Sequence, residues 1–257
     1  MADEMNRALI GHTGFVGSTL LNDNSYEALF NSRNIESIRG QHFSSIVCAG
    51  VSAVKWMANK EPEQDREAIA RLVEPLKDVT TDRFILISTV DVYPDPRGVS
   101  EKDVPDISAA QPYGRHRREL EEWVQDKFEN VLIVRLPALF GAGLKKNVIF
   151  DLMNLNQTEK INPNGVFQWY PMRRFAADLA RLDASGKALV NVAVEPVATS
   201  EIASEFFPDV KIGSSDTPPV GYDMRTDYPE LLDGTGDYHI GRKDVLRELG
   251  LFIGNPS

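Results

Sequence analysis

ALIGHTGFVGSTLL, residues 8–21, decides the fold of this chain. It places Gly11, Gly14 and Gly17 between an apolar run typical of a buried strand and a segment with the apolar spacing of a helix. A tight turn and a close approach of backbone amides to a pyrophosphate both need residues without a Cβ atom, and a helix N-terminus supplies positive potential for phosphates. The segment therefore predicts a dinucleotide-binding loop, although a simple strand-to-helix turn would contain similar glycines. The candidate cofactor contacts here are Gly11, Thr13, Gly14, Phe15, Val16 and Gly17.

The first 140 residues alternate between strand and helix patterns. Short aliphatic runs typical of buried strands lie at 7–11, 27–30, 45–49, 83–88 and 131–136. Apolar residues recur at three- and four-residue spacing in 15–23, 61–79 and 113–128. This alternation predicts an α/β protein with a doubly wound, Rossmann-like parallel sheet in a domain of residues 1–140.

Beyond residue 140 the apolar spacing becomes irregular, and prolines and glycines are frequent. Residues 141–257 are therefore expected to form a smaller, mixed C-terminal lobe that binds substrate. A helix at 173–183 is expected to return to the first domain, and a strand at 189–194 and a helix at 241–249 complete the predicted elements.

The composition favours a globular protein with a small-molecule ligand. The 257 residues are 42% hydrophobic and carry a formal net charge of −10, with a pI near 5.0. An acidic chain repels nucleic acid and anionic membranes, so an anionic ligand needs a local cluster of positive groups. The N-terminal segment lacks the features of a signal peptide and no long apolar run follows, so we expect a cytoplasmic protein. A single cysteine, Cys48, excludes an internal disulfide and a cysteine-based zinc site, and no metal site is predicted. Cys48 lies in an apolar run typical of a strand and is expected to be buried.

The end of the second predicted strand indicates which dinucleotide binds. An acidic residue that bonds the ribose 2′-hydroxyl is expected about 20 residues beyond the glycine loop. This position holds Asn31, and Arg33 follows two residues later. Because a planar guanidinium makes paired bonds to phosphate oxygens, NADP is preferred to NAD, and NAD remains open. The alternative is that Arg33 is a solvated loop residue.

Five short motifs follow one another along the first 143 residues. They are GHTGFVG (11–17), CAG (48–50), ISTVDVY (87–93), YGRHR (113–117) and RLPALFGAG (135–143). Together they resemble the extended short-chain dehydrogenase/reductase family of nucleotide-sugar epimerases, dehydratases and reductases. The resemblance implies a nicotinamide cofactor that exchanges hydride with a nucleotide sugar. It also implies cofactor contacts at Ala49, Gly50 and Val51.

Tyr113 and Arg117 lie four residues apart and therefore share one face of the predicted helix. A cation beside a phenol lowers its pKa from about 10, as proton transfer near neutral pH requires. The resemblance implies that Tyr113 is the general acid/base and that Thr89 orients the substrate oxygen. Arg117 stands at the position where the family has lysine, and the resemblance implies that it holds the cofactor ribose. Because arginine is larger than lysine and planar, the activity is either retained, reduced or absent. His116 points to another side of the helix and is expected at the surface.

Asp91, Lys146 and Arg225 are the candidate substrate contacts. Dehydratases of the family carry an acid pair directly after the threonine, and only Asp91, the second member, is present here. Dehydration is therefore disfavoured, and Asp91 contacts substrate or is a structural acid at a strand end. Lys146 and Arg225 are candidate cations for a substrate diphosphate, with solvated surface residues as the alternative.

These residues predict an NADP(H)-dependent oxidoreductase acting on a carbonyl or hydroxyl group of a nucleotide-activated sugar. A nucleotide-sugar epimerase with tightly held NAD(P) is the second prediction, and a non-catalytic dinucleotide-binding sensor or interaction protein is the third. Helices 62–78 and 113–128 carry apolar stripes that permit a homodimer contact, although core packing explains the same pattern. The stripes include Ile69, Leu72, Leu120 and Val124.

Overall fold

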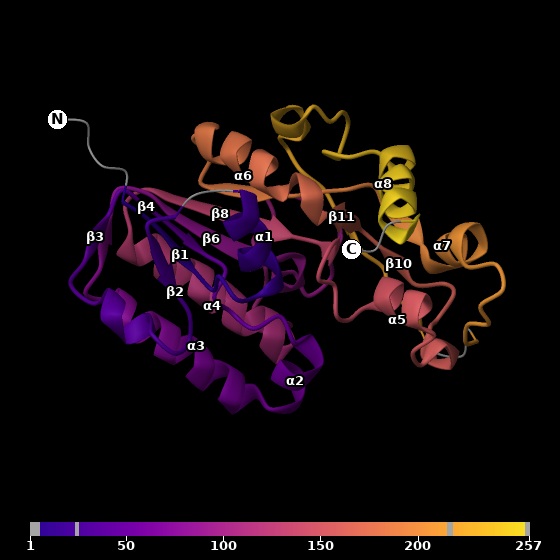
Figure 1. Cartoon of the computed structure of the whole chain (residues 1–257), viewed down its shortest axis with the longest axis horizontal. Helices are drawn as coiled ribbons and strands as arrows, with labels where there is room; N and C mark the ends of the chain where they lie inside the picture. The colour runs from indigo at the N-terminus through magenta and orange to yellow at the C-terminus, as the bar shows by residue number, and fades with distance from the viewer. Residues whose placement is uncertain (1–5, 24–25, 215–217, 255–257) are drawn as a thin grey trace. The chain divides into compact units, whose positions relative to one another are not determined.

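The computed structural model describes residues 6–23, 26–214 and 218–254 (Figure 1). The chain divides into two compact units that interleave along the sequence. The first unit consists of Met1–Pro94, Val104–Arg135 and Ala176–Val190. The second consists of Asp95–Asp103, Leu136–Phe175 and Asn191–Ser257.

A six-stranded parallel sheet forms the centre of the first unit, in the order β12-β8-β6-β4-β1-β2. Its strands are β1 (Arg7–Ile10), β2 (Ala28–Phe30), β4 (Ser45–Cys48), β6 (Phe84–Thr89), β8 (Val131–Leu136) and β12 (Leu189–Asn191). The chain runs from β1 to β2 on one side and then returns to β4 on the other side of β1. Ligands of such sheets bind outside the carboxyl ends of the strands at this switch point. The predicted doubly wound α/β fold is confirmed.

Helices cover both faces of this sheet (Figure 1). The helix α1 (Phe15–Asp23) follows β1, and α3 (Pro62–Leu76) packs beside α4 (Pro112–Lys127) on the other face. Both α3 and α4 begin with proline, whose missing N–H would have no partner in the first turn. The remaining elements of this unit are η1 (Ile35–Ile38), α2 (Lys55–Lys60), η2 (Val90–Val92), α6 (Phe175–Ala184) and the parallel pair β3 (His42–Phe43) and β5 (Thr80–Thr81).

The short helix α2 was not predicted from the sequence, which indicated a single helix over 61–79. Pro62 explains the division, because proline disfavours helical geometry in the residue before it. Glu61 accordingly lies outside the helical region, with φ −124° and ψ 67°. The break separates α3 from α2, which contributes residues to the candidate site.

Short strand pairs and short helical segments make up most of the second unit. The strand pairs are β9 (Ala138–Phe140) with β11 (Trp169–Pro171), β10 (Val166–Phe167) with β13 (Val197–Ala198), and β7 (Arg97–Val99) with β14 (Asp223–Met224). The helical segments are α5 (Val148–Asn154), η3 (Thr158–Lys160), η4 (Met172–Arg174), α7 (Thr199–Phe206), η5 (Pro229–Leu232) and α8 (Arg242–Gly254). The helix α8 extends past the predicted end at 249, and its Phe252 ring lies 5.8 Å from that of Phe140.

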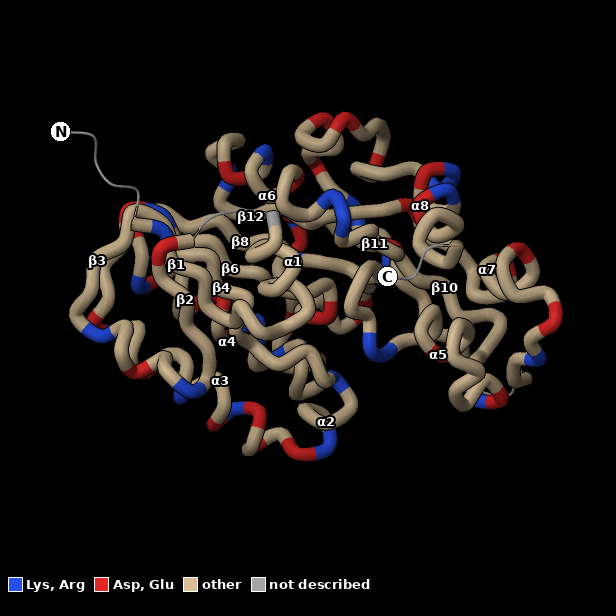
Figure 2. The backbone as a smooth tube through the Cα atoms, viewed as in Figure 1, with Lys and Arg blue, Asp and Glu red and all other residues tan. Residues whose placement is uncertain are grey.

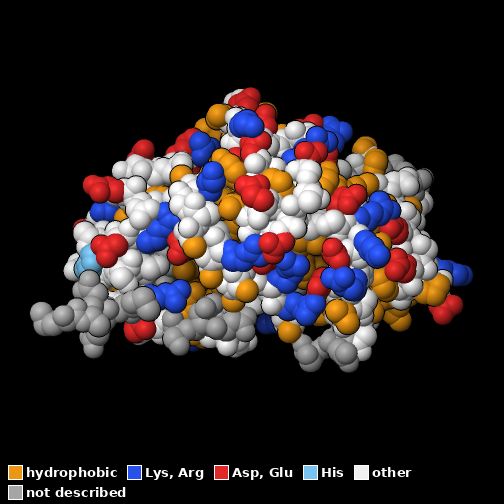
Figure 3. Space-filling model, turned by 90° about the horizontal axis from the view of Figure 1, so that it is seen from above, with side chains coloured by type: hydrophobic (Ala, Val, Ile, Leu, Met, Phe, Trp, Pro, Cys, Tyr) orange, Lys and Arg blue, Asp and Glu red, His pale blue; other side chains and the backbone are white. Residues whose placement is uncertain are grey.

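Charged side chains of both signs are interspersed on the surface. Acidic and basic positions follow one another along α2 and α3 (Figure 2), and the face in Figure 3 likewise mixes both signs. Within residues 6–23, 26–214 and 218–254, no helix is both long and apolar enough to cross a membrane. The first five residues, on which the signal-peptide argument rested, lie outside the described ranges.

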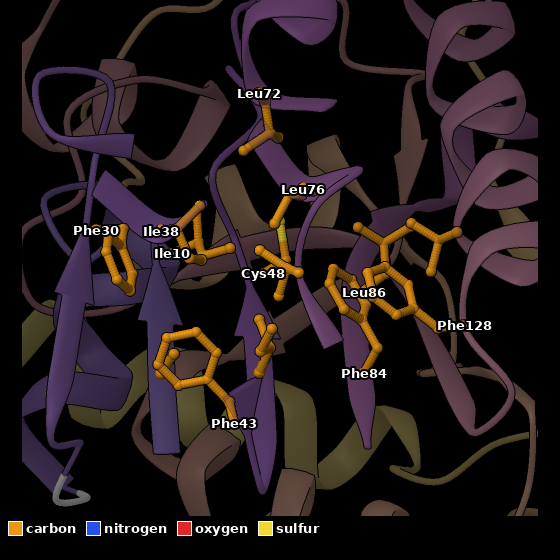
Figure 4. Close-up of a cluster of buried hydrophobic side chains, with 14 of the residues drawn as sticks. Ile10, Phe30, Ile38, Phe43, Cys48, Leu72, Leu76, Phe84, Leu86 and Phe128 are labelled. Atoms are coloured by element: carbon orange, nitrogen blue, oxygen red, sulfur yellow. The ribbon is translucent and has the colours of Figure 1, made fainter. Parts of the chain in front are cut away.

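A hydrophobic cluster between the sheet and the face of α3 and α4 forms the core of the first unit (Figure 4). Phe84 and Phe128 stack with ring centroids 4.4 Å apart, and Phe30 meets Phe43 edge to face at 5.9 Å. Cys48 is 1% exposed, and burial raises the pKa of its thiol to about 11, so it is the expected buried structural cysteine.

The apolar stripes of α3 and α4 also pack in this core. Leu72, Leu120 and Val124 belong to the cluster, and Ile69 is partly buried against it. Core packing therefore accounts for these positions, and the homodimer contact stays a prediction.

A buried ion pair fixes α4 to the sheet. Glu121 is 0% exposed and Arg135, on β8, is 1% exposed. The Arg135 Nε and Nη2 groups donate to the two carboxylate oxygens of Glu121 over 2.9 and 2.6 Å. Ser88 of β6 donates to the same carboxylate at 2.5 Å. A buried charge pair that is fully hydrogen-bonded is costly to break, so this network holds the helix that carries Tyr113 in a fixed position.

Candidate functional site

The glycine loop forms the turn at the carboxyl end of β1. Gly11 has φ +87°, and a Cβ atom there would clash with the carbonyl oxygen of Ala49 at the end of β4. A Cβ atom at Gly17 would clash with the carbonyl oxygen of Gly11, so the first turn of α1 lies directly on the loop. Only glycine satisfies both positions. The first N–H groups of a helix have no partner within it, which makes this end of α1 suited to a phosphate.

The end of β2 lies beside this loop. The N–H of Gly11 donates to the carbonyl of Phe30 over 2.8 Å, and the Asn31 side chain lies 3.0 Å from Nε2 of His12. Asn31 also accepts a hydrogen bond from the backbone N–H of Arg33 at 2.8 Å. The exposed Arg33 is therefore held by its backbone at the carboxyl edge of the sheet. His12 was not predicted as part of this region, although its position within the glycine loop was a signal.

The turn after β4 supplies the third predicted group of cofactor contacts. Ala49 donates from its N–H to the carbonyl of Ile10 at 2.9 Å, which keeps the turn against the glycine loop. A small hollow lies next to this turn, between it and α3. Its lining residues are Gly50, Val51, Ser52, Asp65, Ala68, Ile69 and Leu72.

Tyr113 and Thr89 meet at the carboxyl end of β6. Thr89 is the last residue of β6, and its hydroxyl accepts from the N–H of Asp91 at 3.2 Å. A Cβ atom at Gly114 would overlap the carbonyl oxygen of Asp91, so this glycine permits the start of α4 to lie against the strand end. Tyr113 is 7% exposed, and Thr89 lies close enough to its phenol to lower the pKa. The structure thus brings together the two residues that the sequence predicted as partners.

The expected lowering of the Tyr113 pKa is wrong for this structure. Burial raises the pKa of the phenol above its usual value, and the charge of Asp91 raises it further. Arg117, Thr89 and Lys55 act in the opposite direction and do not outweigh burial. Tyr113 is consequently protonated near neutral pH.

Arg117 does not project along the Tyr113 side chain to the hydroxyl. Its guanidinium carbon lies 3.8 Å from the centre of the Tyr113 ring, over the ring face. Its Nη1 and Nη2 groups donate to the two carboxylate oxygens of Asp65, on α3, at 2.5 and 2.8 Å. Nη1 also donates to the Tyr113 carbonyl at 3.0 Å, and Nη2 to the Ser52 carbonyl at 2.7 Å. The guanidinium is 4% exposed and is held inside the protein by these contacts.

The prediction that His116 lies at the surface is wrong. His116 is 4% exposed, and its Nδ1 lies 2.8 Å from Oδ2 of Asp65. Because a carboxylate only accepts hydrogen bonds, this nitrogen is the donor. Asp65, His116 and Arg117 therefore form one buried network between α3 and α4. Asp65 was not predicted from the sequence, although its four- and seven-residue spacing to Ile69 and Leu72 places it on the buried face of α3.

Asp91 pairs with a lysine that the sequence argument also missed. The Nζ atom of Lys55, on α2, lies 2.7 Å from Oδ1 of Asp91. Asn59, one helical turn after Lys55, accepts from the N–H of Tyr113 at 2.9 Å. The helix α2 therefore contacts both the end of β6 and the start of α4. The spacing of Lys55 and Asn59 was the available signal, but α2 itself had not been predicted.

The remaining predicted substrate residues belong to the second unit. Arg225 pairs with Asp223 at 3.0 Å and with Asp237 at 3.2 Å, and its side chain is 41% exposed. Lys146 is exposed and precedes Asn147, the N-cap of α5. Trp169 and Tyr170 are 1% and 0% exposed, so both belong to the core.

Comparison with known proteins supports the fold and identifies the family. A sequence model of the NAD dependent epimerase/dehydratase family matches residues 29–165, more than half of the 257-residue chain. The glycine loop precedes the matched segment. A search of curated proteins by sequence finds no match.

Several solved structures share the fold. A UDP-glucose 4-epimerase from Thermotoga maritima, solved with UDP-glucose, is 15% identical with a TM-score of 0.72, covering 98% of this chain and 100% of its own. A dTDP-4-dehydrorhamnose reductase from Bacillus anthracis, in complex with NADP, is 16% identical with a TM-score of 0.74, covering 98% and 99%. RMD from Pseudomonas aeruginosa, complexed with NADPH, is 18% identical with a TM-score of 0.71, covering 98% and 100%.

These neighbours are nucleotide-sugar epimerases and reductases of the extended short-chain dehydrogenase/reductase type, so the predicted resemblance is confirmed. Their identities to this chain show the shared fold. The family assignment comes from the match over residues 29–165. The chain belongs to the NAD dependent epimerase/dehydratase family.

Proposed function

We propose that the chain is an NADP(H)-dependent oxidoreductase that acts on a carbonyl or hydroxyl group of a nucleotide-activated sugar. The observation that carries this proposal is the placement of Tyr113 beside Thr89 at the carboxyl edge of the sheet, where Gly114 lets the start of α4 lie against the end of β6. The glycine loop, with its two positions that exclude a Cβ atom, lies in the same unit. Neighbours of the same fold are complexed with NADP or NADPH, and others with UDP-glucose.

Each residue has a defined part in this proposal. The cofactor, when bound, supplies or accepts a hydride. The glycine loop and the start of α1 hold its pyrophosphate, the turn Ala49–Val51 contacts it, and Arg33 bonds a 2′-phosphate. Thr89 orients the substrate oxygen. Tyr113 is protonated near neutral pH, so it donates its proton to the oxygen that develops negative charge during carbonyl reduction.

The proposed division of labour follows the sequence. Residues 1–140 contain the cofactor contacts, and residues 141–257 carry the cations proposed for the substrate diphosphate, Lys146 and Arg225. Asp91 is proposed to contact the sugar. The preference for NADP over NAD depends on Arg33 alone, so Arg33→Ala is expected to weaken NADP binding about tenfold or more and to leave NAD binding unchanged. Fluorescence titration of the two reduced cofactors measures this difference.

Tyr113→Phe tests the catalytic assignment. We expect kcat to fall by about 100-fold or more with UDP- and dTDP-keto sugars, because the proton donor is lost while the ring that packs against Arg117 is kept. Cofactor affinity should stay within about twofold. Tyr26→Phe, which removes a phenol at the opposite end of the sheet strands, is the control. Full turnover by the Tyr113 variant would refute the assignment.

An epimerase is the second candidate, since the family name and the neighbour from Thermotoga maritima both point to epimerisation. An epimerase returns the hydride to the same sugar, so its cofactor is not consumed. Cofactor that stays bound through dialysis and sugar inversion without net oxidation would identify this activity. Consumption of NADPH in proportion to substrate would identify the reductase. Cofactor binding without turnover of any tested sugar would identify the non-catalytic sensor.

A further inference from the structure

The guanidinium of Arg117 is already bound to other groups of the protein. Both terminal nitrogens of its guanidinium are engaged by Asp65, and further bonds go to backbone carbonyls. Asp65 also balances the positive charge, and the group is 4% exposed. The guanidinium of Arg117 therefore contacts the face of the Tyr113 ring and not its hydroxyl, and both of its terminal nitrogens are bound to other groups.

Two residues of α2 bind the segments on either side of the candidate site. Lys55 and Asn59 are four residues apart and share one face of the helix. Asn59 bonds the N–H of Tyr113, which fixes α2 to the first turn of α4. Lys55 bonds Asp91, which fixes the same helix to the end of β6. The two bonds determine where the ammonium of Lys55 lies relative to Tyr113.

The end of β6 lies against the start of α4. The N–H of Asp91 bonds the hydroxyl of Thr89, and Thr89 lowers the pKa of the neighbouring Tyr113. The missing Cβ atom of Gly114 brings the backbone of α4 onto the carbonyl of Asp91. Lys55, Asp91 and Thr89 therefore converge on the part of the chain that contains the phenol. The side chain of Lys55 is 45% exposed, so a ligand can reach its ammonium.

We propose that Lys55, held by Asp91, is the positioning cation for Tyr113 and for the substrate oxygen, in the place that Arg117 does not fill. The proposal rests on the proposed function, because it assigns Lys55 to the same proton transfer. Asp91 then orients Lys55 instead of acting as a proton donor itself. Its neighbouring charge also moderates the effect of the ammonium on the phenol.

All charged groups around Tyr113 enter this balance. Lys55 on α2 and Arg117 on α4 lower the pKa of Tyr113, whereas Asp91 raises it. Asp65 on α3 accepts hydrogen bonds from the guanidinium of Arg117. His116 on α4 donates to the same carboxylate. Removal of the Lys55 charge should therefore raise the pKa of Tyr113 further.

A measurement on the protein without ligands tests the proposal first. The protein is labelled with tyrosine carrying ¹³C at Cζ, and the Tyr113 resonance is assigned by its loss in Tyr113→Phe. We expect Lys55→Met to move this resonance at pH 8, because the charge beside the phenol changes. Lys60→Met, at the other end of α2, is the matched control and should leave it in place. An unmoved Tyr113 resonance in Lys55→Met overturns the proposal.

Kinetics provide the second test. Lys55→Met should lower kcat about tenfold or more, shift the limb of the pH profile that belongs to Tyr113 to higher pH, and change KM for the cofactor by less than twofold. Lys55→Arg should recover part of kcat. A pH profile identical to that of the wild type would overturn the proposal even if kcat fell.

The two failures are distinguishable. If Tyr113→Phe keeps full turnover, the proposed function fails, whereas the NMR measurement still decides whether Lys55 acts on Tyr113. If Tyr113→Phe is inactive and Lys55→Met behaves as the wild type in both tests, only the role of Lys55 fails.

Discussion

Asp65→Asn is the most informative single change in the first unit. Asp65 is 8% exposed and accepts two hydrogen bonds from Arg117 and one from His116. Asparagine keeps the shape of the side chain but loses its charge and presents an NH₂ group toward donors. The guanidinium of Arg117 would then be a buried charge without a balancing carboxylate. Breaking one side of a buried pair in this way costs about 3–5 kcal/mol.

Urea denaturation followed by circular dichroism measures the loss of free energy of unfolding. In thermal denaturation the melting temperature should fall by about 10 °C, because 1 kcal/mol corresponds to about 2–4 °C for a chain of this length. Glu67→Gln on the same helix is the matched control. Its ion pair with Arg71 spans 3.9 Å and both side chains are 71% exposed, so its loss should cost less than about 0.5 kcal/mol. Equal stability of the Asp65 variant and the wild type would refute the argument.

The pH dependence of the same variant has a defined sign. Burial alone would raise the pKa of Asp65, but hydrogen bonds and charge from Arg117 and His116 lower it overall. A carboxyl group whose pKa is depressed by folding stabilises the protein above its unfolded value of about 3.9, and this contribution is lost as the pH falls through the folded value. The wild type should therefore keep its advantage over Asp65→Asn down to about pH 4 and lose it below. An advantage that vanishes already between pH 7 and pH 5 would contradict this reasoning.

Two substitutions and one labelling experiment test the fold around the site. Gly114→Ala places a Cβ atom on the carbonyl oxygen of Asp91, so it should displace α4 and lower the free energy of unfolding by several kcal/mol; denaturation with unchanged stability would show that the two backbones do not approach closely. Glu121→Gln should cost about 3–5 kcal/mol because Arg135 is 1% exposed and loses its charged partner, whereas a loss below 1 kcal/mol would exclude the buried pair as a main support. Cys48 should react with a thiol reagent far more slowly in the native protein than in urea, because its thiol is buried and has a pKa of about 11; equal rates would show that the strand is accessible.

Local sequence patterns were sufficient for the parallel sheet of the first unit. The glycine loop and the alternation of apolar runs with helical spacing predicted the parallel sheet, since buried strands and amphipathic helices differ in apolar period. Gly11 and Gly17 could also be recognised from the sequence, because only glycine lacks the Cβ atom that would clash in this turn. Tyr113 and Thr89 could be paired because both belong to motifs whose order along the chain is characteristic.

The charges of the site could not be assigned from the sequence. The four-residue spacing of Tyr113 and Arg117 placed them on one helix face, but the partner of the guanidinium, Asp65, is 52 residues away in the chain. Lys55 and Asp91 are likewise 36 residues apart. Periodicity describes which side of an element a residue occupies, whereas the partner of a charge depends on how separate elements pack. The sequence by itself therefore determined the sheet, the glycine loop and the pairing of phenol and hydroxyl, and only the tertiary structure decided which cation is buried and which one a ligand can reach.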